Sequence, residues 1–542
     1  MSLIPEKAQI HKTIQEALIK KSWRNTMEID QILEDAAKYH EANEFDIAKI
    51  MYERILSLNS NHYEAAHMLG VIAFQRGDHR TAVLYFDQAI KLKPDYAEAY
   101  SNFGNVLHAA GNYAVAAKLQ EQALQINPKF ANAYNNLGNS LLEQGDSEKA
   151  RDNYLKAIEL RFHHPEAHNN LGNAYTNLKD FKKAEESYVE SLNQDPNSAR
   201  AWLNYGHLLV DSLRFEEAQE KYERCNQLDP GYPQCHFNLA LLYLLNGDFE
   251  KGWKEYEWRT EWMIARGIKE VDRNFAQPKW QGESLENKTL FLTAEQGYGD
   301  IIMFSRYASL MIGQAKTVIL EVKKGLGSFL GVCTPGVILI EEGDQLPKFD
   351  YWIPLMSLPK VFNTNLTNIP NQKLKNREEK LNEWKNKLGV SKNKRIGLCW
   401  KGSENHRFNP LRAISLSQLL KTLPNNFDYI SLQKDVTEEE KELLSCYDIT
   451  DFSDVGALCE LVDLIITVDT AVAHVAGGLG VPVWTLIPYL PDWRWLKEGD
   501  KTLWYPSMKL YRQEKPKENP GTLIATDWAP VFDRIKEDLK TL

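Results

Sequence analysis

The sequence predicts an α-helical solenoid in the first half of the chain and, in the second half, an α/β region built on two parallel sheets. Small residues recur every 34 positions as far as Gly252, which favours the solenoid. Beyond residue 288, short β-rich runs alternate with helical stretches, which favours the sheets. Over 542 residues, the 43% apolar and 25% charged composition is typical of a globular chain of several domains.

Charge and cysteine usage exclude several function classes. The net charge of −10 leaves no basic footprint for nucleic acid. The six cysteines are scattered without a C-x-x-C pair, so we expect no structural zinc site and a reducing compartment. The first 23 residues lack the apolar core of a signal peptide, and no window reaches about 18 consecutive apolar residues. We therefore expect a cytoplasmic protein without a membrane span.

The repeat consists of two ladders of small residues and one of prolines. Glycine lies at Gly70, Gly104, Gly138, Gly172 and Gly206, alanine at Ala48, Ala82, Ala116, Ala150, Ala184 and Ala218, and proline at Pro94, Pro128, Pro196 and Pro230. A 34-residue period with small residues at two offsets is that of tetratricopeptide repeats. Residues 29–262 are predicted to form this solenoid, after an N-terminal helix or extension over 1–28. We expect the aromatic residues Phe86, Tyr154, Tyr188 and Tyr222 to fill the gap between neighbouring units.

An asparagine ladder follows the same period, and it has two interpretations. Its members are Asn102, Asn136, Asn170, Asn204 and Asn238. Carboxamides both donate and accept hydrogen bonds, so such a ladder can hold a peptide backbone whatever its side chains. The alternative is that these residues only cap or bridge neighbouring helices. The ladder is similar to the one lining the solenoid of the O-linked N-acetylglucosamine transferases, and that resemblance implies binding of a protein acceptor.

The second half is expected to contain two Rossmann-like domains facing each other across a cleft. The predicted strands are TLFLTA (289–294), TVILEV (317–322), VILIEE (337–342), RIGLCW (395–400), DYISLQ (428–433), LIITVD (464–469) and PVWTLI (482–487). Strands alternating with helices indicate parallel sheets. The predicted segments are a connector (263–287), a first domain (288–375), a linker (376–394), a second domain (395–522) and a C-terminal helix (523–542). We expect this helix to cross back onto the first domain.

Two strand-to-helix loops carry the chemistry, because ligands of open α/β sheets bind at the carboxyl ends of the strands. In the first loop, Gly297 and Gly299 permit a tight turn and Asp300 lies at a helix start, where an acid is often only a cap. In the second loop, Asp469 ends a strand, Thr470 and Ala471 begin a helix, and His474 follows one turn later. Amide groups at such a helix start suit a diphosphate, although a lone histidine is more often structural.

Together these loops resemble the heptosyltransferase-like glycosyltransferases of the GT-B fold. The match is closer still to bacterial proteins in which tetratricopeptide repeats precede such a domain, and these include flagellin glycosyltransferases. The motifs are PKWQGESL, AEQGYGDIIMFSRY, GLCWKGS, YISLQ, DLIITVDTAVAHVAGGLGVPVW, DWRWL and WYPSMKLYRQ. The resemblance implies an α solenoid of tetratricopeptide repeats followed by an α/β GT-B glycosyltransferase with two Rossmann-like domains. One departure is Val455-Gly456, where the family usually has Thr-Ala.

By position, Asp300 matches the proposed catalytic base, and Asp469, Thr470, Ala471 and His474 match the donor diphosphate loop. Lys401 or Arg412 could neutralise the leaving phosphate, Arg407 competes for that role, and each has the alternative of a solvated surface charge. Trp400 and Gln433 end strands and are expected to line the nucleotide pocket. Asp492, Trp493, Arg494 and Trp495 are expected to close the floor of the cleft, unless the tryptophans are simply core.

The resemblance implies sugar transfer from a nucleotide sugar to a hydroxyl of a protein held by the repeats. No two aspartates are separated by one residue, so we expect a metal-independent enzyme without a cofactor beyond its nucleotide-sugar co-substrate. The alternatives are a non-catalytic scaffold with a degenerate nucleotide-binding domain, and a transferase acting on lipopolysaccharide or another glycan. The sequence leaves open the sugar, the acceptor and whether the chain forms a homo-oligomer.

Overall fold

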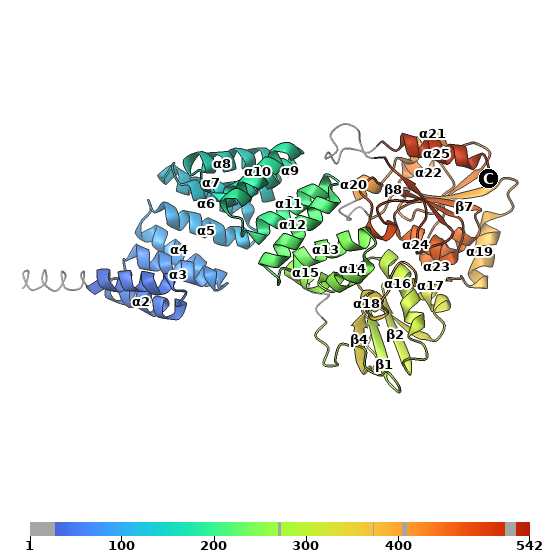
Figure 1. Ribbon diagram of the computed structural model, residues 1–542, viewed down its shortest axis with the longest axis horizontal. Coiled ribbons are helices and arrows are strands. Elements are labelled where there is room, and N and C mark those ends of the chain that lie inside the picture. The colour runs from blue at the N-terminus through green and yellow to red at the C-terminus, as the bar shows by residue number, and fades with distance from the viewer. Residues whose placement is uncertain (1–27, 269–272, 372, 404–408, 515–526) are drawn as a thin grey trace, which may run out of the picture. The chain divides into compact units, whose positions relative to one another are not determined.

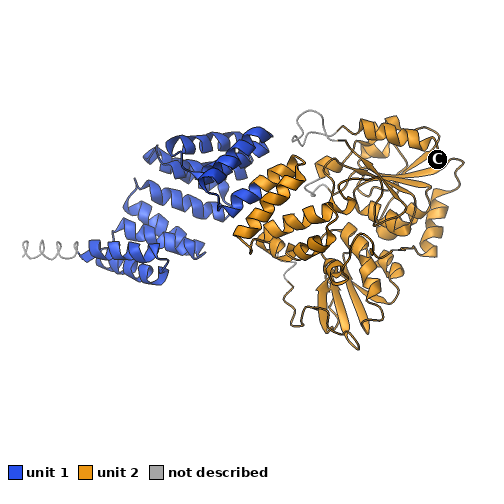
Figure 2. Ribbon diagram, viewed as in Figure 1, with its two compact units in different colours: residues 1–204 blue, residues 205–542 orange. Residues whose placement is uncertain are grey.

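The computed structural model describes residues 28–268, 273–371, 373–403, 409–514 and 527–542. The chain forms two compact units, residues 1–204 (unit 1) and residues 205–542 (unit 2), as Figure 2 shows. The division falls inside helix α11 (Ala199–Asp211) and not at the predicted end of the repeats near residue 262. The predicted N-terminal helix or extension (1–28) lies almost wholly outside the described residues.

Unit 1 consists of antiparallel helix pairs with a constant period (Figure 1). A helix over residues 28–41 precedes nine others. These are α2 (Phe45–Leu58), α3 (Tyr63–Gln75), α4 (His79–Leu92), α5 (Ala97–Ala109), α6 (Tyr113–Ile126), α7 (Ala131–Glu143), α8 (Ser147–Leu160), α9 (Pro165–Asn177) and α10 (Phe181–Gln194), with the start of α11. All six alanines of the predicted ladder are fully buried. The helical solenoid predicted from the 34-residue period is therefore confirmed.

The glycine ladder lets an aromatic ring lie directly on the neighbouring helix. A Cβ atom on Gly172 would lie 2.5 Å from Cε1 of Tyr188, and one on Gly138 equally close to Tyr154. Each ring thus packs against the glycine of its own helix pair. Tyr154 also joins Leu171 of the next pair in one apolar cluster. The predicted contact between neighbouring repeats is correct, but the ring first fills the gap between the two helices of its own repeat.

This close packing makes Gly172 sensitive to a single added methyl group. We expect Gly172→Ala to lower the free energy of unfolding of unit 1 by about 1–3 kcal/mol, because Tyr188 must move off its place on α9. Gln122→Ala, at an exposed position of α6 in the same unit, is the control. Urea unfolding followed by circular dichroism measures both changes. Equal stability of Gly172→Ala and the wild type would contradict the packing argument.

Unit 2 begins with the last repeat helices and continues into the first parallel sheet. The helices are α12 (Phe215–Leu228), α13 (Pro233–Leu245), α14 (Phe249–Tyr256) and α15 (Arg259–Ala265). The sheet has the order β3-β2-β1-β4, with β1 (Thr289–Thr293), β2 (Thr317–Val322), β3 (Val337–Glu341) and β4 (Tyr351–Pro354). All its pairings are parallel. Its helical segments are α16 (Tyr298–Leu310), α17 (Gly327–Cys333), η2 (Leu355–Ser357) and α18 (Leu358–Val361).

The second sheet is also wholly parallel and has the order β6-β5-β7-β8-β9. Its strands are β5 (Arg395–Cys399), β6 (Asp428–Ser431), β7 (Leu464–Val468), β8 (Val483–Ile487) and β9 (Met508–Arg512). Its helices are α19 (Glu378–Leu388), α20 (Asn409–Arg412), α21 (Leu416–Thr422), α22 (Glu438–Lys441), α23 (Phe452–Glu460), α24 (Ala471–Leu479), η3 (Trp493–Trp495) and α25 (Ala529–Leu539). Helix α19 lies inside the predicted linker, where the Trp384 indole donates to Asp454 (2.8 Å).

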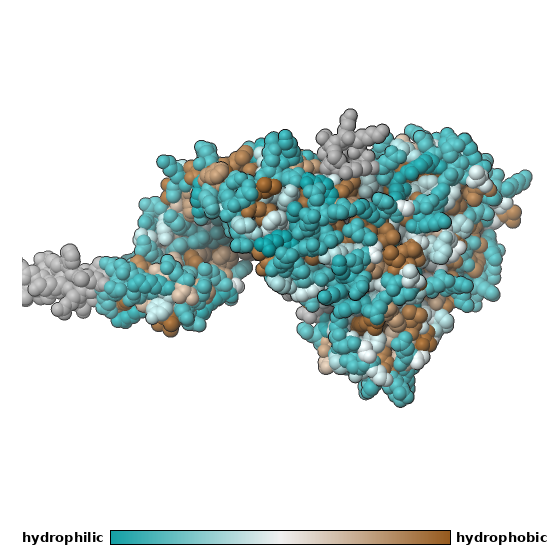
Figure 3. All heavy atoms as spheres, in the orientation of Figure 1, coloured by the Kyte–Doolittle hydropathy of each residue, from teal (hydrophilic) through white to brown (hydrophobic). Residues whose placement is uncertain are grey.

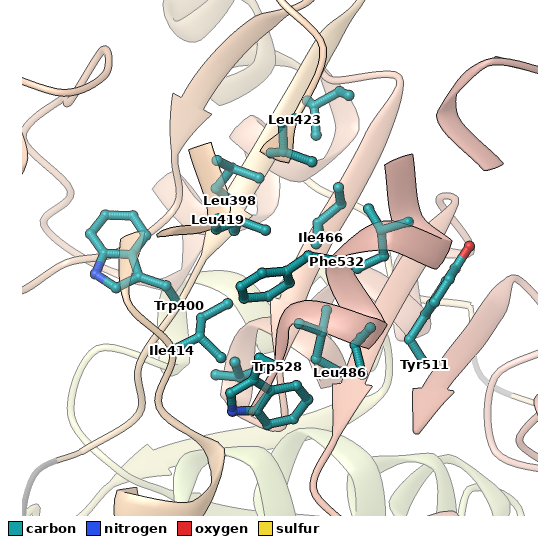
Figure 4. Packing of buried hydrophobic residues seen from close by; sticks show 14 of the residues in the cluster. Leu398, Trp400, Ile414, Leu419, Leu423, Ile466, Leu486, Tyr511, Trp528 and Phe532 are labelled. Atoms are coloured by element: carbon teal, nitrogen blue, oxygen red, sulfur yellow. The ribbon is translucent and has the colours of Figure 1, made fainter. Parts of the chain in front are cut away.

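The expectation for the C-terminal helix is wrong. Helix α25 packs on the second sheet, in its own domain, and does not cross back onto the first. Val531 and Phe532 lie in one buried cluster with Leu398, Ile466 and Leu486 of three adjacent strands (Figure 4). An apolar stripe on α25 thus completes the core beside strands that are apolar on both faces.

On the face that Figure 3 shows, hydrophilic residues predominate and hydrophobic patches are scattered among them. Within the described part of the chain, no helix has both the length and the apolarity needed to cross a membrane.

Candidate functional site

Asp300 lies at the start of α16, in the loop that follows β1. Its Oδ2 accepts a hydrogen bond from the backbone N–H of Gly297 (2.8 Å), so the carboxylate does cap this helix. Its Oδ1 is ion-paired with the Arg494 guanidinium, which belongs to the second domain. The side chains of Asp300 and Arg494 are only 16% and 10% exposed. The sequence offered a helix cap as the simpler role of Asp300. The carboxylate does cap the helix, and it also has Arg494 as a second partner.

Arg494 connects this loop to the short helix η3. Its Nη1 donates to Asp492 (2.8 Å), and its guanidinium carbon lies 4.3 Å from the centre of the Trp493 ring. Burial works against its charge, but the carboxylates of Asp300 and Asp492 outweigh burial and raise the pKa of Arg494 well above its usual value. The motif DWRWL thus places a permanent cation against the candidate base. Sequence reasoning expected these residues to close a cleft floor and missed the ion pair.

Helices α16 and α24 meet at Gly299. A Cβ atom on Gly299 would lie 2.7 Å from Cδ2 of His474, so any larger residue would push the two helices apart. His474 is 4% exposed, and its Nδ1 lies 2.9 Å from the Tyr505 hydroxyl. Burial, reinforced by nearby Arg494, lowers the pKa of His474 well below its usual value. The imidazole is therefore neutral, and it lies beside the loop that carries Asp300.

The second loop places Asp469 after β7 and Thr470 at the start of α24. The Thr470 hydroxyl accepts from the backbone N–H of Val472 (3.3 Å), which caps the helix. Burial, together with the carboxylate of Asp492, raises the pKa of Asp469 to about 6. Ala471 is the first residue of α24, and its Cα would be 3.6 Å from a Cβ atom on Gly299. The structure thus brings Gly297, Gly299, Asp300, Asp469, Thr470, Ala471 and His474 into one neighbourhood.

The raised pKa of Asp469 predicts a specific pH dependence of stability. Between pH 3.8, the ordinary pKa of an aspartate, and about pH 6, the folded protein binds a proton on Asp469 more tightly than the unfolded chain does. The contribution of Asp469 to the free energy of unfolding therefore falls as the pH rises through this range. We expect Asp469→Asn to melt at a higher temperature than the wild type at pH 7.5, with an advantage that shrinks as the pH approaches 4. The exposed Asp435→Asn is the control in thermal melts, and an advantage independent of pH would contradict the assignment.

Lys401, Trp400 and Gln433 lie together at the ends of β5 and β6. The Lys401 ammonium is 3.1 Å from Oε2 of Glu440, and the Trp400 indole donates to the same carboxylate (2.6 Å). Gln433 accepts from the backbone N–H of Lys401 (3.2 Å). Trp400 is only 1% exposed and belongs to the buried cluster of Figure 4, which speaks against direct contact between its ring and a ligand.

Arg412 is the candidate phosphate-binding cation that lies next to Asp469. Its Nη1 donates to the Asp469 carbonyl oxygen (2.6 Å), while its Nε is buried without a hydrogen-bond partner among the described residues. A Cβ atom on Gly402 would lie 2.5 Å from its Nη2, so GLCWKGS needs a glycine there to admit the guanidinium. Arg407 lies outside the described residues. Among the described residues, no cluster of three or more His, Cys, Asp or Glu side chains could hold a metal ion.

The last repeat helices are built into this site, which sequence reasoning did not foresee. Arg259 of α15 is fully buried and donates to Glu295, at 2.7 and 3.2 Å, in the loop that leads to Asp300. It also donates to Ser357 (2.8 Å). The next loop residue, Gln296, donates to the Tyr256 hydroxyl of α14 (2.9 Å). The helices that end the solenoid therefore fix the position of the loop before Asp300.

The asparagine ladder forms bridges between successive helix pairs. Asn170 donates to Asn135 and Asn204 to Asn169, each at 3.0 Å and each 35 residues back along the chain. Asn102 with His67 (2.8 Å) and Asn136 with Ser101 (3.4 Å) form contacts with the same spacing, and Asn238 contacts His207, 31 residues back (2.7 Å). The bridging interpretation is therefore observed. Acceptor binding by these five asparagines stays a prediction.

Models of the tetratricopeptide repeat match residues 39–92, 67–131, 129–197 and 199–232. The N-terminal region thus contains tetratricopeptide repeats, which indicates a role in binding proteins. Protein FlbA of Caulobacter vibrioides is 26% identical over 328 residues, which cover 53% of this chain and 52% of FlbA. The chain therefore spans about half the length of this curated relative.

Solved structures of repeat proteins also resemble part of the chain. YrrB, a tetratricopeptide-repeat protein described as having an unusual peptide-binding site, is 21% identical, covers 34% of this chain and 95% of its own, and has a TM-score of 0.28. PilF of Pseudomonas aeruginosa is 20% identical, covers 39% of this chain and 97% of its own, and has a TM-score of 0.32. At these scores the likeness carries no argument about function.

Proposed function

We propose that the chain is a glycosyltransferase that moves a sugar from a nucleotide sugar to a Ser or Thr hydroxyl of a protein acceptor held by the repeats, with flagellin as one candidate acceptor. The observation that carries this proposal is the approach of two strand-end loops from two parallel sheets, which brings Asp300, Arg494, His474 and Asp469 together. Ligands of such sheets bind at the carboxyl ends of their strands.

In the proposed reaction, the acceptor hydroxyl oxygen attacks the anomeric carbon of the donor sugar and forms the new glycosidic bond. The bond between that carbon and the phosphate oxygen breaks, and its electron pair leaves with the nucleotide. The hydroxyl proton passes to the Asp300 carboxylate, which acts as general base. Backbone N–H groups at the start of α24 and the Arg412 guanidinium stabilise the departing phosphate.

Two of the features described above support this assignment of roles. The buried Nε of Arg412 is a donor without a partner among the described residues, in a side chain that contacts the Asp469 carbonyl oxygen just before α24. The ring of His474 packs against Gly299 and so keeps the start of α24 beside the loop that precedes Asp300. The alternatives of a non-catalytic scaffold and of a glycan acceptor remain, and they predict different outcomes in the following experiment.

The test is release of the free nucleotide from ADP-heptose, UDP-sugars and a CMP-linked nonulosonate. Each donor is assayed alone, with a Ser/Thr-containing protein acceptor and with a glycan acceptor, and a parallel series contains EDTA. We expect one donor to be consumed faster when the protein acceptor is added, and EDTA to leave the rate unchanged. A non-catalytic scaffold would consume none of them. Consumption stimulated by a glycan and not by protein would support the other alternative, and loss of activity in EDTA would contradict metal independence.

A further inference from the structure

The candidate base is covered on both of its oxygens. Oδ2 of Asp300 accepts a hydrogen bond from the Gly297 N–H, and Oδ1 is ion-paired with Arg494. Each carboxylate oxygen that could receive the proton of an acceptor hydroxyl therefore already has a partner. The Gly297 contact is part of the helix cap, and losing it would fray α16. The Arg494 contact is different, because Arg494 has a second carboxylate partner, Asp492, that stays with it when it leaves Asp300.

The surroundings of Arg494 favour an anion. Three guanidinium groups lie around the first turn of α24. Arg412 donates to the Asp469 carbonyl oxygen just before this helix, and Arg494 is ion-paired with Asp300. The Arg306 guanidinium lies 5.0 Å from the centre of the Tyr505 ring, whose hydroxyl is 2.9 Å from His474 of α24. The Arg306 guanidinium donates to the carbonyl oxygens of Pro370 and Trp504, at 3.1 Å each, and so holds the two domains together at this point. A phosphate group at the start of α24 would lie next to Arg412, and Arg494 lies at the start of α16, which packs against the same turn of α24.

We infer that Arg494 is a switch between the base and the donor: it pairs with Asp300 until the phosphate groups of the nucleotide sugar bind, and it then transfers to them and uncovers Asp300. This inference rests on the proposed function. It gives Arg494 a donor-binding role in addition to that of Arg412, and this role depends on the ion pair between Arg494 and Asp300. Donor binding would thereby precede proton transfer, and the base would stay covered in the absence of the donor.

The inference predicts opposite effects of substitutions at the two ends of one ion pair. Arg494→Gln removes a donor to the phosphate and should weaken nucleotide binding by about tenfold or more. Asp300→Asn removes the carboxylate that competes with the phosphate for Arg494. Nucleotide binding should tighten by about threefold or more, because the ion pair no longer has to break before Arg494 can bind the phosphate. In the Arg494→Gln background, Asp300→Asn should give no such gain.

The experiment is calorimetric titration of the full chain with ADP, GDP, UDP, dTDP, CMP and inorganic pyrophosphate, on the wild type, both single variants and the double variant. Lys497→Gln is the matched control. It removes a cation from the same segment as Arg494, but Lys497 is ion-paired with Glu216 and not with Asp300. Thermal melts of each variant verify folding, and Arg494→Lys, which keeps the charge, should retain part of the affinity if Arg494→Gln does not fold.

A nucleotide that binds the wild type, Arg494→Gln and Asp300→Asn equally well would overturn the switch and leave the proposed function standing. A gain from Asp300→Asn that persists in the double variant would also overturn it, because the gain would then not act through Arg494. If none of the six ligands binds the wild type, both the switch and the proposed function fail. Tightening by Asp300→Asn that is abolished by Arg494→Gln is the result that the inference predicts.

Discussion

Asp300→Asn is expected to lower the rate of sugar transfer by about 10²–10⁴-fold, because a positioned general base contributes acceleration of that size. The variant should remain folded, since an asparagine oxygen can still accept the Gly297 N–H that caps α16. The measurement is the rate of nucleotide release from the preferred donor in the presence of acceptor, together with the melting temperature.

Glu342→Gln is the control for the loss of a carboxylate, because Glu342 is an exposed residue directly after β3. It should transfer sugar at the wild-type rate. Full activity in Asp300→Asn would show that Asp300 is not the base, even if the nucleotide still binds. Loss of activity together with unfolding would instead make Asp300 a structural cap, and the melting temperature separates these outcomes.

Arg259→Met is expected to destabilise unit 2 by about 3–5 kcal/mol, because it leaves Glu295 as a buried carboxylate without its cation. The melting temperature of unit 2 should fall by on the order of 10 °C. Arg266→Met, which replaces the exposed arginine directly after α15, should change the free energy of unfolding by less than about 0.5 kcal/mol.

A double variant tests whether the uncompensated charge causes this loss. Adding Glu295→Gln to Arg259→Met removes the buried charge and should recover part of the lost stability. If Arg259→Met melts like the wild type, the repeat helices do not hold the loop of Asp300. No recovery in the double variant would assign the loss to packing alone.

Much of the fold could be predicted from the sequence because its signals are local and periodic. The runs at 317–322 and 395–400 coincide with β2 and β5 to within one residue, since buried parallel strands are mostly apolar. The strand β4 was missed because its sequence, YWIP, ends in a proline, which weakens the signal of a strand. In β9, the sequence MKLYR alternates apolar and charged residues, which weakens the signal of a buried strand.

The candidate site could be predicted only in part. Asp300 and Asp469 carry their own signal, because each lies between an apolar run and a helical stretch, with glycines nearby. The partner of Asp300 lies 194 residues away in DWRWL, where three aromatic or apolar neighbours make the segment read as core. Arg259 and Glu295 are 36 residues apart and belong to different modules, so no period or spacing connects them. A pairing between distant segments depends on the packing of whole elements, and the sequence pattern does not contain it.

The predicted end of the solenoid at residue 262 illustrates the same limit. The 34-residue period continues to Gly252 without any change at residue 205, where unit 2 begins. What joins the last repeats to the α/β domains is a set of tertiary contacts, including the hydrogen bond from the Trp253 indole to the Thr364 carbonyl oxygen (3.0 Å). A fragment that starts at residue 263 would lack Arg259 and Trp253.

The central claim is that the loops around Asp300 and Asp469 form a nucleotide site that needs no metal ion. The most direct measurement is the melting temperature of unit 2 with ADP, GDP, UDP, dTDP and CMP, each with and without EDTA. A nucleotide at 100 times its dissociation constant should add about 2.7 kcal/mol to the stability of the unit that binds it. We predict that one nucleotide raises the melting temperature selectively and equally in EDTA. No shift with any of the five would contradict the claim, and a shift abolished by EDTA would contradict its metal independence.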